Sequence, residues 1–315
     1  MEIVKTDLID CYKRISNYIH RTPVHTSQQM NQLSGAQLYF KCENFQRIGA
    51  FKMRGAANAV LQLSTEQKSK GVVTHSSGNF AQALALAAKN ASTQAYIVMP
   101  SNAPQVKKNA VKHYGAQIIE CEPTVIARET AAKLVEIEKG ATFIHPYDDR
   151  NVIIGQSTAC IELFEDYPDL DSVITPVGGG GLIAGTALAA RFFSDKCKVF
   201  GAEPDEVNDA YRSMQTGRIE KNTSTNTIAD GLKTNLGILN FPIIQQHVNE
   251  IITVSETEII TAMKLIWERM KLVVEPSSAV ALAAVLKNKT TFANQKVGII
   301  ISGGNVDLSA LPFNS

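Results

Sequence analysis

Short runs of β-branched and other apolar residues recur along this chain, separated by about 10–15 residues of helical periodicity. The runs predict strands at Gln37–Lys41, Gly71–His75, Ala95–Met99, Gln117–Glu120, Ser172–Pro176, Lys198–Ala202 and Val297–Ile301. The Ala-rich amphipathic segments between them predict helices such as Phe80–Lys89, Pro104–Tyr114, Thr124–Lys139 and Leu182–Phe193. This alternation favours an α/β fold of mostly parallel, twisted sheets flanked by helices.

The length of the chain predicts two domains. It has 315 residues, and a single core stops growing at about 250–300 residues. Residues 70–145 form a compact block of alternating strand and helix patterns, so we expect a small domain there. A large domain would then combine residues 1–69 with residues 146–315. Gly217–Asn226, rich in Thr, Asn and Ser, predicts a surface loop.

The composition favours a small-molecule substrate. A formal net charge of +1 gives no reason to expect binding to nucleic acid or to an anionic membrane. The five cysteines show no CxxC spacing, so neither a disulfide framework nor a zinc site is indicated. The N-terminus does not resemble a signal peptide, and no apolar run approaches about 18 residues. We therefore expect a cytoplasmic protein.

Four consecutive glycines, Gly178–Gly181, follow a predicted strand and precede a predicted helix. Backbone N–H groups there can converge on a phosphate, although a tight turn is the simpler interpretation. Gly179-x-Gly181-x-x-Ala184, with Glu203 about 20 residues further on, also fits the dinucleotide fingerprint. An NAD-dependent oxidoreductase and a non-catalytic phosphate-binding protein thus remain alternatives. A P-loop is excluded because no Gly-Lys-Ser/Thr follows.

Other polar clusters follow predicted strands or start helices. Ser76 and Ser77 could cap a helix or hold a carboxylate. Ser302, at the end of a buried strand, could belong to a turn or face a cofactor ring. Lys52, in Arg47–Ala56, could be an exposed lysine or a nucleophilic amine in a pocket. Local sequence alone does not decide between these alternatives.

Four of these motifs occur together in one order: Gly49–Gly55 around Lys52, Ser76–Asn79, Gly178–Gly181, and Ser302–Asn305. The set resembles the fold-type II pyridoxal-phosphate enzymes, specifically the serine/threonine dehydratase and serine racemase group. The similarity covers nearly the whole chain. It implies a two-domain fold, pyridoxal 5'-phosphate as cofactor and a homodimer.

The resemblance also implies roles for the cofactor-binding residues. Lys52 would hold the cofactor covalently, and Phe51 would lie beside its ring. Asn79 would hydrogen-bond the ring hydroxyl, Gly178–Gly181 would bind the phosphate, and Ser302 would face the pyridine nitrogen. Desolvation would lower the pKa of Lys52, because a lysine must be neutral to attack.

The same resemblance assigns the substrate side of the site. Ser76, Ser77 and Asn79 would bind the substrate carboxylate, and Ser77 would be the second acid/base in a racemase. Arg128 matches an arginine near the substrate, where it could bind the second carboxylate of 3-hydroxyaspartate. Without the resemblance, Arg128 is an exposed helix residue.

A divalent-cation site is implied as well. Glu203 and Asp209, with the carbonyl of Val207, match a site for Mg²⁺ or Ca²⁺ in racemase-like members. Two carboxylates, a carbonyl and waters are a suitable ligand set for these hard cations. The alternative is an ordinary solvated acidic loop.

The expected activity is dehydration of a β-hydroxy amino acid (serine, threonine or 3-hydroxyaspartate) to a 2-oxo acid and ammonia. A neutral hydroxyl at the pyridine nitrogen makes a weaker electron sink than a carboxylate would, which favours expelling a β-hydroxyl. Serine racemisation by Lys52 and Ser77 is the alternative. The sequence departs from the family at Ala50, usually serine, and Phe80, usually histidine.

Overall fold

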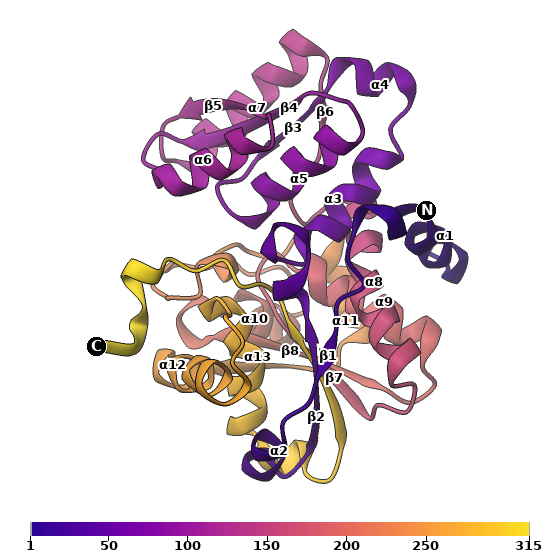
Figure 1. Cartoon of the computed structure of the whole chain (residues 1–315), viewed down its shortest axis with the longest axis vertical. Helices are drawn as coiled ribbons and strands as arrows, with labels where there is room; N and C mark the ends of the chain where they lie inside the picture. Colours follow the sequence, from indigo (N-terminus) through magenta and orange to yellow (C-terminus); the bar gives the residue numbers. More distant parts are fainter. Residues whose placement is uncertain (1, 315) are drawn as a thin grey trace.

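The computed structural model describes residues 2–314, which form two mainly parallel β-sheets with helices packed around them (Figure 1). One sheet has the strand order β1-β2-β10-β7-β8-β9 and the other β5-β4-β3-β6. Within both sheets, only the pairing of β1 with β2 is antiparallel. The strands are β1 (Val24–His25), β2 (Gln37–Cys42), β3 (Val72–His75), β4 (Ala95–Pro100), β5 (Gln117–Cys121), β6 (Thr142–Phe143), β7 (Ser172–Pro176), β8 (Lys198–Pro204), β9 (Glu250–Val254) and β10 (Lys296–Ile301).

Helices connect most of these strands and cover the faces of both sheets. They are α1 (Lys5–Ile15), α2 (Gln28–Ser34), α3 (Lys52–Leu61), α4 (Thr65–Lys70), α5 (Asn79–Asn90), α6 (Gln105–His113), α7 (Val125–Lys139), α8 (Arg150–Asp166), α9 (Gly181–Phe193), α10 (Asp209–Thr216), α11 (Asn240–His247), α12 (Glu256–Leu265), α13 (Pro276–Lys287) and α14 (Lys289–Phe292).

The structure confirms the α/β class and every predicted strand, with ends shifted by at most two residues. Three strands were not predicted: β1, β6 and β9. The first two are only two residues long, too short for any periodic signal. β9 lies at the edge of its sheet, and its first residue, Glu250, is exposed. Residues 217–226 contain no helix or strand, as predicted.

Helices α3 and α8 approach each other closely through two glycines. A Cβ built on Gly155 would lie 2.5 Å from the Cα of Gly55, so the two backbones are in direct contact. The side-chain oxygen of Gln156 also accepts a hydrogen bond from the N–H of Gly55, at 3.1 Å. α8 is buried along most of its length. The helix that begins at Lys52 is therefore packed directly onto a core helix.

The parallel pairing brings the polar motifs to one edge of each sheet. β10 lies between β2 and β7, and all three run in the same direction. Ser302 and the Gly178–Gly181 loop therefore leave the large sheet on the same side, at its carboxyl edge. In the other sheet, β3 leads into Ser76–Gly78 and α5 in the same way. This edge is where α/β sheets commonly bind ligands.

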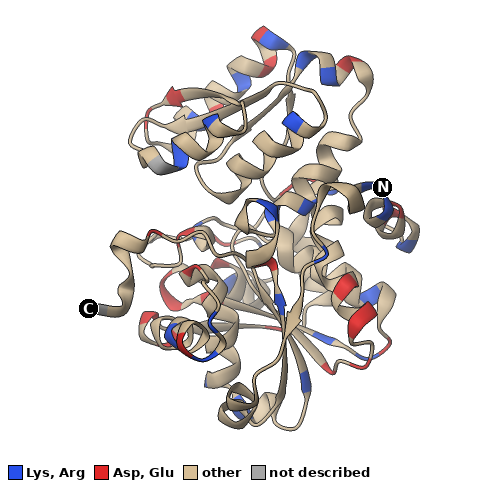
Figure 2. Ribbon diagram, in the orientation of Figure 1, with Lys and Arg blue, Asp and Glu red and all other residues tan. Residues whose placement is uncertain are grey.

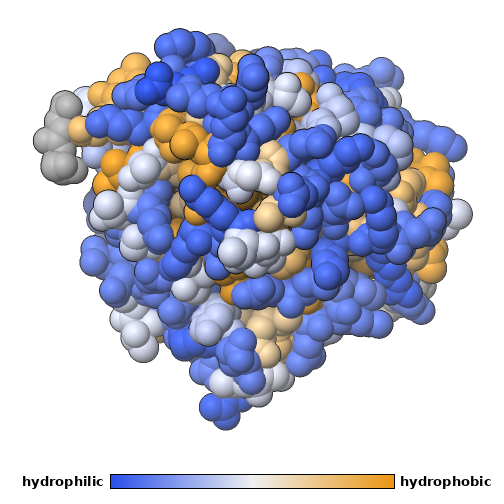
Figure 3. All heavy atoms as spheres, turned by 90° about the horizontal axis from the view of Figure 1, so that it is seen from below, coloured by the Kyte–Doolittle hydropathy of each residue, from blue (hydrophilic) through white to orange (hydrophobic). Residues whose placement is uncertain are grey.

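Lys and Arg residues and Asp and Glu residues are both spread along the ribbon in the view of Figure 2. From below, the surface is mainly hydrophilic, with scattered apolar groups (Figure 3). Among the described residues, no helix has the length and apolar character needed to cross a membrane.

Candidate active site

Lys52 is the first residue of α3, and its amine lies in a mainly apolar setting. Nζ donates a hydrogen bond to the carbonyl of Pro146 at 2.9 Å. It lies 5.0 Å from the ring centre of Phe51 and 5.8 Å from that of Phe80. Burial lowers the pKa of the amine to about 8, against a smaller raising effect of Glu275. A substantial neutral fraction is therefore available near neutral pH.

Asn79 is the first residue of α5. Its side chain forms hydrogen bonds with Glu275, just before α13, and with Asn305, after β10. Nδ2 donates to both carboxylate oxygens of Glu275, at 3.2 and 3.1 Å. Oδ1 accepts from Nδ2 of Asn305 at 2.9 Å. Burial raises the pKa of Glu275 to about 7, although the hydrogen bond from Asn79 opposes this. The amide of Asn79 is thus held in place from two sides.

The tetraglycine loop presents free N–H groups at the start of α9. In the part of the chain that the structure describes, the N–H groups of Gly178–Gly181 make no hydrogen bond, and no side chain caps α9. The helix N-terminus adds positive potential at the same place. Gly180 has φ +91°, a conformation that strains any other residue. These features fit a phosphate group.

The walls of this loop explain why all four positions are glycines. A Cβ at Gly179 would lie 2.3 Å from the ring of Tyr147, and one at Gly178 would lie 2.9 Å from the carbonyl oxygen of Gly231. A Cβ at Gly180 would meet Leu236, so it would point toward the protein and not into the cradle. Asn240 donates to the carbonyl of Gly179 at 2.7 Å. Packing and hydrogen bonds therefore fix the loop.

Ser302 directly follows β10 and is almost fully buried. Its hydroxyl lies 3.0 Å from that of Ser278, which also donates to the carbonyl of Gly303 at 2.7 Å. The carbonyl of Ser302 accepts from the N–H of Phe51 at 3.0 Å, which places Ser302 next to the start of α3. The structure thus brings this serine beside Lys52. Together with the glycine cradle, the amine and the hydroxyl fit pyridoxal phosphate.

The residues that the sequence predicts to bind substrate lie at the carboxyl edge of the smaller sheet. The hydroxyl of Ser76 accepts from the N–H of Gly78 at 3.4 Å, and Ser77 is partly buried beside it. Arg128 is in the first turn of α7, where Nε donates to the carbonyl of Thr124 at 3.4 Å. Burial lowers the pKa of His75, and the charge of Arg128 lowers it further. Helix α7, which carries Arg128, packs against β3.

Glu203 and Asp209 lie together inside the protein, and neither is exposed. Burial raises the pKa of Glu203 well above its usual value, and the charge of Asp209 raises it further. Burial also raises the pKa of Asp209 to about 6. The hydrogen bonds that reach the two carboxylates come from the N–H groups of Ala210, Tyr211 and Leu236 and from the side chain of Asn222.

These two carboxylates form no ion pair within residues 2–314. Val207 ends the short helical turn Asp205–Val207 between them. No set of three or more His, Cys, Asp or Glu side chains suited to a metal occurs in the described residues. A cation here would need the Val207 carbonyl and water as further ligands, and a buried pair of like charges is a donor set that suits one.

The sequence analysis did not identify several residues of this site. Glu275 precedes Pro276 at the start of α13, where an acidic residue is ordinary for a helix start. Tyr147 and Asn240 contact the glycine loop only through the fold. Pro146 contributes a backbone carbonyl, which no side-chain pattern indicates.

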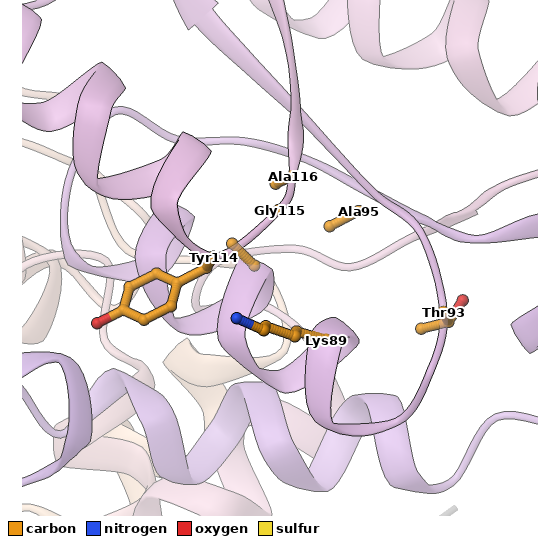
Figure 4. Close-up of a pocket in the computed structure, with 7 residues that line it drawn as sticks. Lys89, Thr93, Ala95, Tyr114, Gly115 and Ala116 are labelled. Carbon is orange, nitrogen blue, oxygen red and sulfur yellow. The ribbon is translucent and has the colours of Figure 1, made fainter.

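A separate hollow lies in the unit built on the smaller sheet (Figure 4). None of the residues around Lys52 contributes to it. Its lining residues come from α5, the loop before β4, the first residue of β4 and the loop after α6: Ala85, Lys89, Thr93, Ala95, Tyr114, Gly115 and Ala116.

Comparison with known proteins gives consistent matches over almost the whole chain. Serine racemase from Dictyostelium discoideum is 52% identical, covering 97% of this chain and 95% of that protein. Its crystal structure superimposes with a TM-score of 0.93, covering 96% of this chain and 98% of that one. Beta-hydroxyaspartate dehydratase from Paracoccus denitrificans is 49% identical, covering 98% of each chain.

The nicotinamide interpretation of Gly179–Ala184 and Glu203 is wrong. Both oxygens of Glu203 accept from backbone N–H groups of α10, so the carboxylate is turned into the protein and not toward a ribose.

The family model described as "Pyridoxal-phosphate dependent enzyme" matches residues 15–303. The chain therefore belongs to the pyridoxal-phosphate-dependent enzymes.

Proposed function

We propose that this enzyme removes water from a β-hydroxy amino acid and releases a 2-oxo acid and ammonia. The observation that carries the proposal is the buried hydroxyl pair of Ser302 and Ser278, at the start of the Lys52 helix. A hydroxyl does not keep a pyridine nitrogen protonated as a carboxylate would. The resulting weaker electron sink favours loss of the β-hydroxyl over a long-lived carbanion.

In this proposal the cofactor is held by residues that the fold has already fixed. Lys52 would provide the amine, and Phe51, whose ring centre is 5.0 Å from that amine, would lie beside the cofactor ring. Asn79 binds the ring hydroxyl with an amide that Glu275 and Asn305 orient. Gly178–Gly181 bind the phosphate through their N–H groups.

Pyridoxal phosphate, when bound, accepts the electron pair that deprotonation leaves at the substrate's α-carbon. Lys52 takes the α-proton, because its lowered pKa lets the neutral amine act as a base. Ser76 and Ser77, with Asn79, hold the substrate carboxylate. The β-hydroxyl takes a proton and leaves as water, and a water molecule is consumed when ammonia is released. The ring of Phe80, with its centre 5.8 Å from the amine, adds an apolar wall on this side.

Racemisation is the second candidate, supported by the 52% identity to a serine racemase. It needs a proton donor on each face of the α-carbon, and Ser77 would supply the second one. Elimination needs only one base and a leaving group. Phe80 contributes no polar group that could hold a reprotonating water, which favours elimination.

The ratio of pyruvate to D-serine formed from L-serine tests this choice. We expect pyruvate to form faster, and Ser77→Ala to reduce racemisation more than elimination, since Lys52 alone would move the α-proton. Coupled assays for the two products measure both rates in one preparation. A ratio below one in the wild type would make racemisation the main activity.

We also propose 3-hydroxyaspartate as a substrate, bound through its second carboxylate by Arg128. Support comes from the place of Arg128 near the end of β3, where its charge lowers the pKa of His75. A relative 49% identical to this chain is named a beta-hydroxyaspartate dehydratase. A guanidinium fork is the side chain that best matches a carboxylate.

Arg128→Gln should lower kcat/KM for 3-hydroxyaspartate by about 10–100-fold, since a hydrogen bond to a charged group contributes about 1.5–3 kcal/mol. Turnover of L-serine, which lacks the second carboxylate, should change much less. Lys133→Gln, on the exposed side of the same helix, is the control. Equal losses with both substrates would refute the role of Arg128.

A divalent cation at Glu203 and Asp209 is a further proposal, with the carbonyl of Val207 and waters completing its ligands. The two buried carboxylates, which lack an ion-pair partner among the described residues, support it. Mg²⁺ and Ca²⁺ both accept such an oxygen set. The cation would hold β8 and α10 together.

Chelator-treated protein should gain melting temperature when Mg²⁺ or Ca²⁺ is added, because a ligand that binds only the folded state stabilises it. Glu203→Gln keeps the size of the side chain but removes its charge, and should abolish the gain. Glu206→Gln, on the exposed part of the same turn, should keep it. No response in wild-type protein shown to be metal-free would leave these residues as a structural carboxylate pair.

We propose residues 70–145 as a small substrate-side domain and residues 1–69 plus 146–315 as the large one. The smaller sheet lies wholly within the first range.

We further propose a cytoplasmic homodimer. All five cysteines are free, which suits a reducing compartment, and the family resemblance implies the dimer.

A further inference from the structure

Arg54, two residues after Lys52 on α3, lies in a cluster of four charged side chains that have no exposed surface. Its Nε and Nη2 donate to the two oxygens of Glu43, at 2.7 and 2.8 Å. Its Nη1 and Nη2 donate to the two oxygens of Glu162, each at 2.8 Å. Nη1 also donates to the hydroxyl of Thr158 at 3.2 Å. One guanidinium therefore binds two carboxylates in bidentate fashion.

The fourth member of the cluster, Lys41, completes its charge balance. Its amine donates to Glu162 at 2.6 Å and to the carbonyl of Thr22 at 2.7 Å. Two cations and two carboxylates leave no net charge. Glu43 follows β2, and Glu162 is on α8. The guanidinium of Arg54 thus connects the first turn of α3 to the end of β2 in the larger sheet and to helix α8.

Besides its packing against α8 and α5, this first turn makes few other hydrogen bonds to the rest of the protein. No side chain caps the N-terminus of α3. Phe51 is held by the carbonyl of Ser302, and Gly55 by the side chain of Gln156. An arginine fork is planar and carries its donors in a fixed geometry, so it sets direction as well as distance. Rotation or sliding of the first turn would break several of these bonds together.

We infer that Arg54 is a positioning residue for Lys52: its double fork fixes the first turn of α3 and so holds the Lys52 amine where it reacts. The inference rests on the proposed role of Lys52 as the cofactor-binding lysine. A displacement of about 1 Å can cost about 100-fold in rate, so a looser first turn should be visible in the chemistry of the amine.

The test follows the reaction of cofactor-free protein with pyridoxal phosphate by stopped-flow absorbance. The Lys52 amine condenses with the aldehyde and releases water. Only the neutral amine attacks, so in the wild type the rate constant rises with pH and levels off above about pH 8, the pKa of Lys52. The profile gives a limiting rate constant and an amine pKa.

Arg54→Lys keeps the charge but loses the fork, and should lower the limiting rate constant at least about 10-fold with an unchanged pKa.

Phe292→Leu is the stability control, since Phe292 is buried against Phe200 and makes no contact with α3. If Arg54→Lys reacts as fast as this variant, Arg54 is only structural and the inference is wrong. A shifted pKa with an unchanged limiting rate would overturn it too, because the cluster would then act through charge.

A second variant keeps the test decisive if Arg54→Lys does not fold. Thr158→Val removes one contact of the guanidinium at nearly constant volume, and should lower the limiting rate constant in the same direction by a smaller factor. A wild-type rate would overturn the inference. Failure of the wild type itself to react with pyridoxal phosphate would instead refute the role of Lys52.

Discussion

The buried fork of Arg54 connects the sheet, a core helix and the helix that carries Lys52. Moving ions out of water is costly, and removing one member of such a cluster typically costs about 3–5 kcal/mol. Burial alone would raise the pKa of Glu43, but Arg54, Lys41 and Thr22 together outweigh it and lower that pKa. The carboxylate thus stays charged and bonded. The Gly55–Gly155 contact can form because these elements are held in one relative position.

Two residues before Arg54 on α3, Lys52 has a different environment, which is mainly apolar. Phe51 and Phe80 flank the amine, and its hydrogen-bond partner is the neutral carbonyl of Pro146. The pKa values of Lys52, about 8, and Glu275, about 7, both fall near neutral pH. Asn79 links Glu275 to the position expected for the ring hydroxyl. Proton positions in the site are therefore set by burial and not by strong ion pairs.

The sequence predicted the parts of this arrangement that depend on local pattern. Strand–helix alternation predicted parallel sheets. Gly178 and Ser302 follow neighbouring strands of one sheet and so share its carboxyl edge, whereas Ser76 follows a strand of the other sheet. Arg54 reads locally like any charged helix residue, because its burial follows from contacts with Glu43 and Glu162, 11 and 108 residues away. Such long-range pairings leave no mark in a single sequence.

Glu275 and the walls of the glycine loop were missed for the same reason. Glu275 and Asn79 are 196 positions apart in the sequence. They lie at the starts of two helices that pack against different sheets. Tyr147 lies in the connection between β6 and α8, and Asn240 hydrogen-bonds the carbonyl of Tyr147 beside the glycine loop. Both contacts depend on the fold and have no local sequence signal. Local motifs thus predicted which residues would meet the cofactor, and the fold shows which residues hold those in place.

The central claim is that Lys52 is the amine that binds pyridoxal phosphate. Borohydride reduction of the loaded protein, followed by peptide mass spectrometry, tests it most directly. The account predicts a single phosphopyridoxyl group, on the peptide that contains Lys52, and none in Lys52→Ala. A label on another lysine in the wild type, or an equally labelled Lys52→Ala protein, would contradict it.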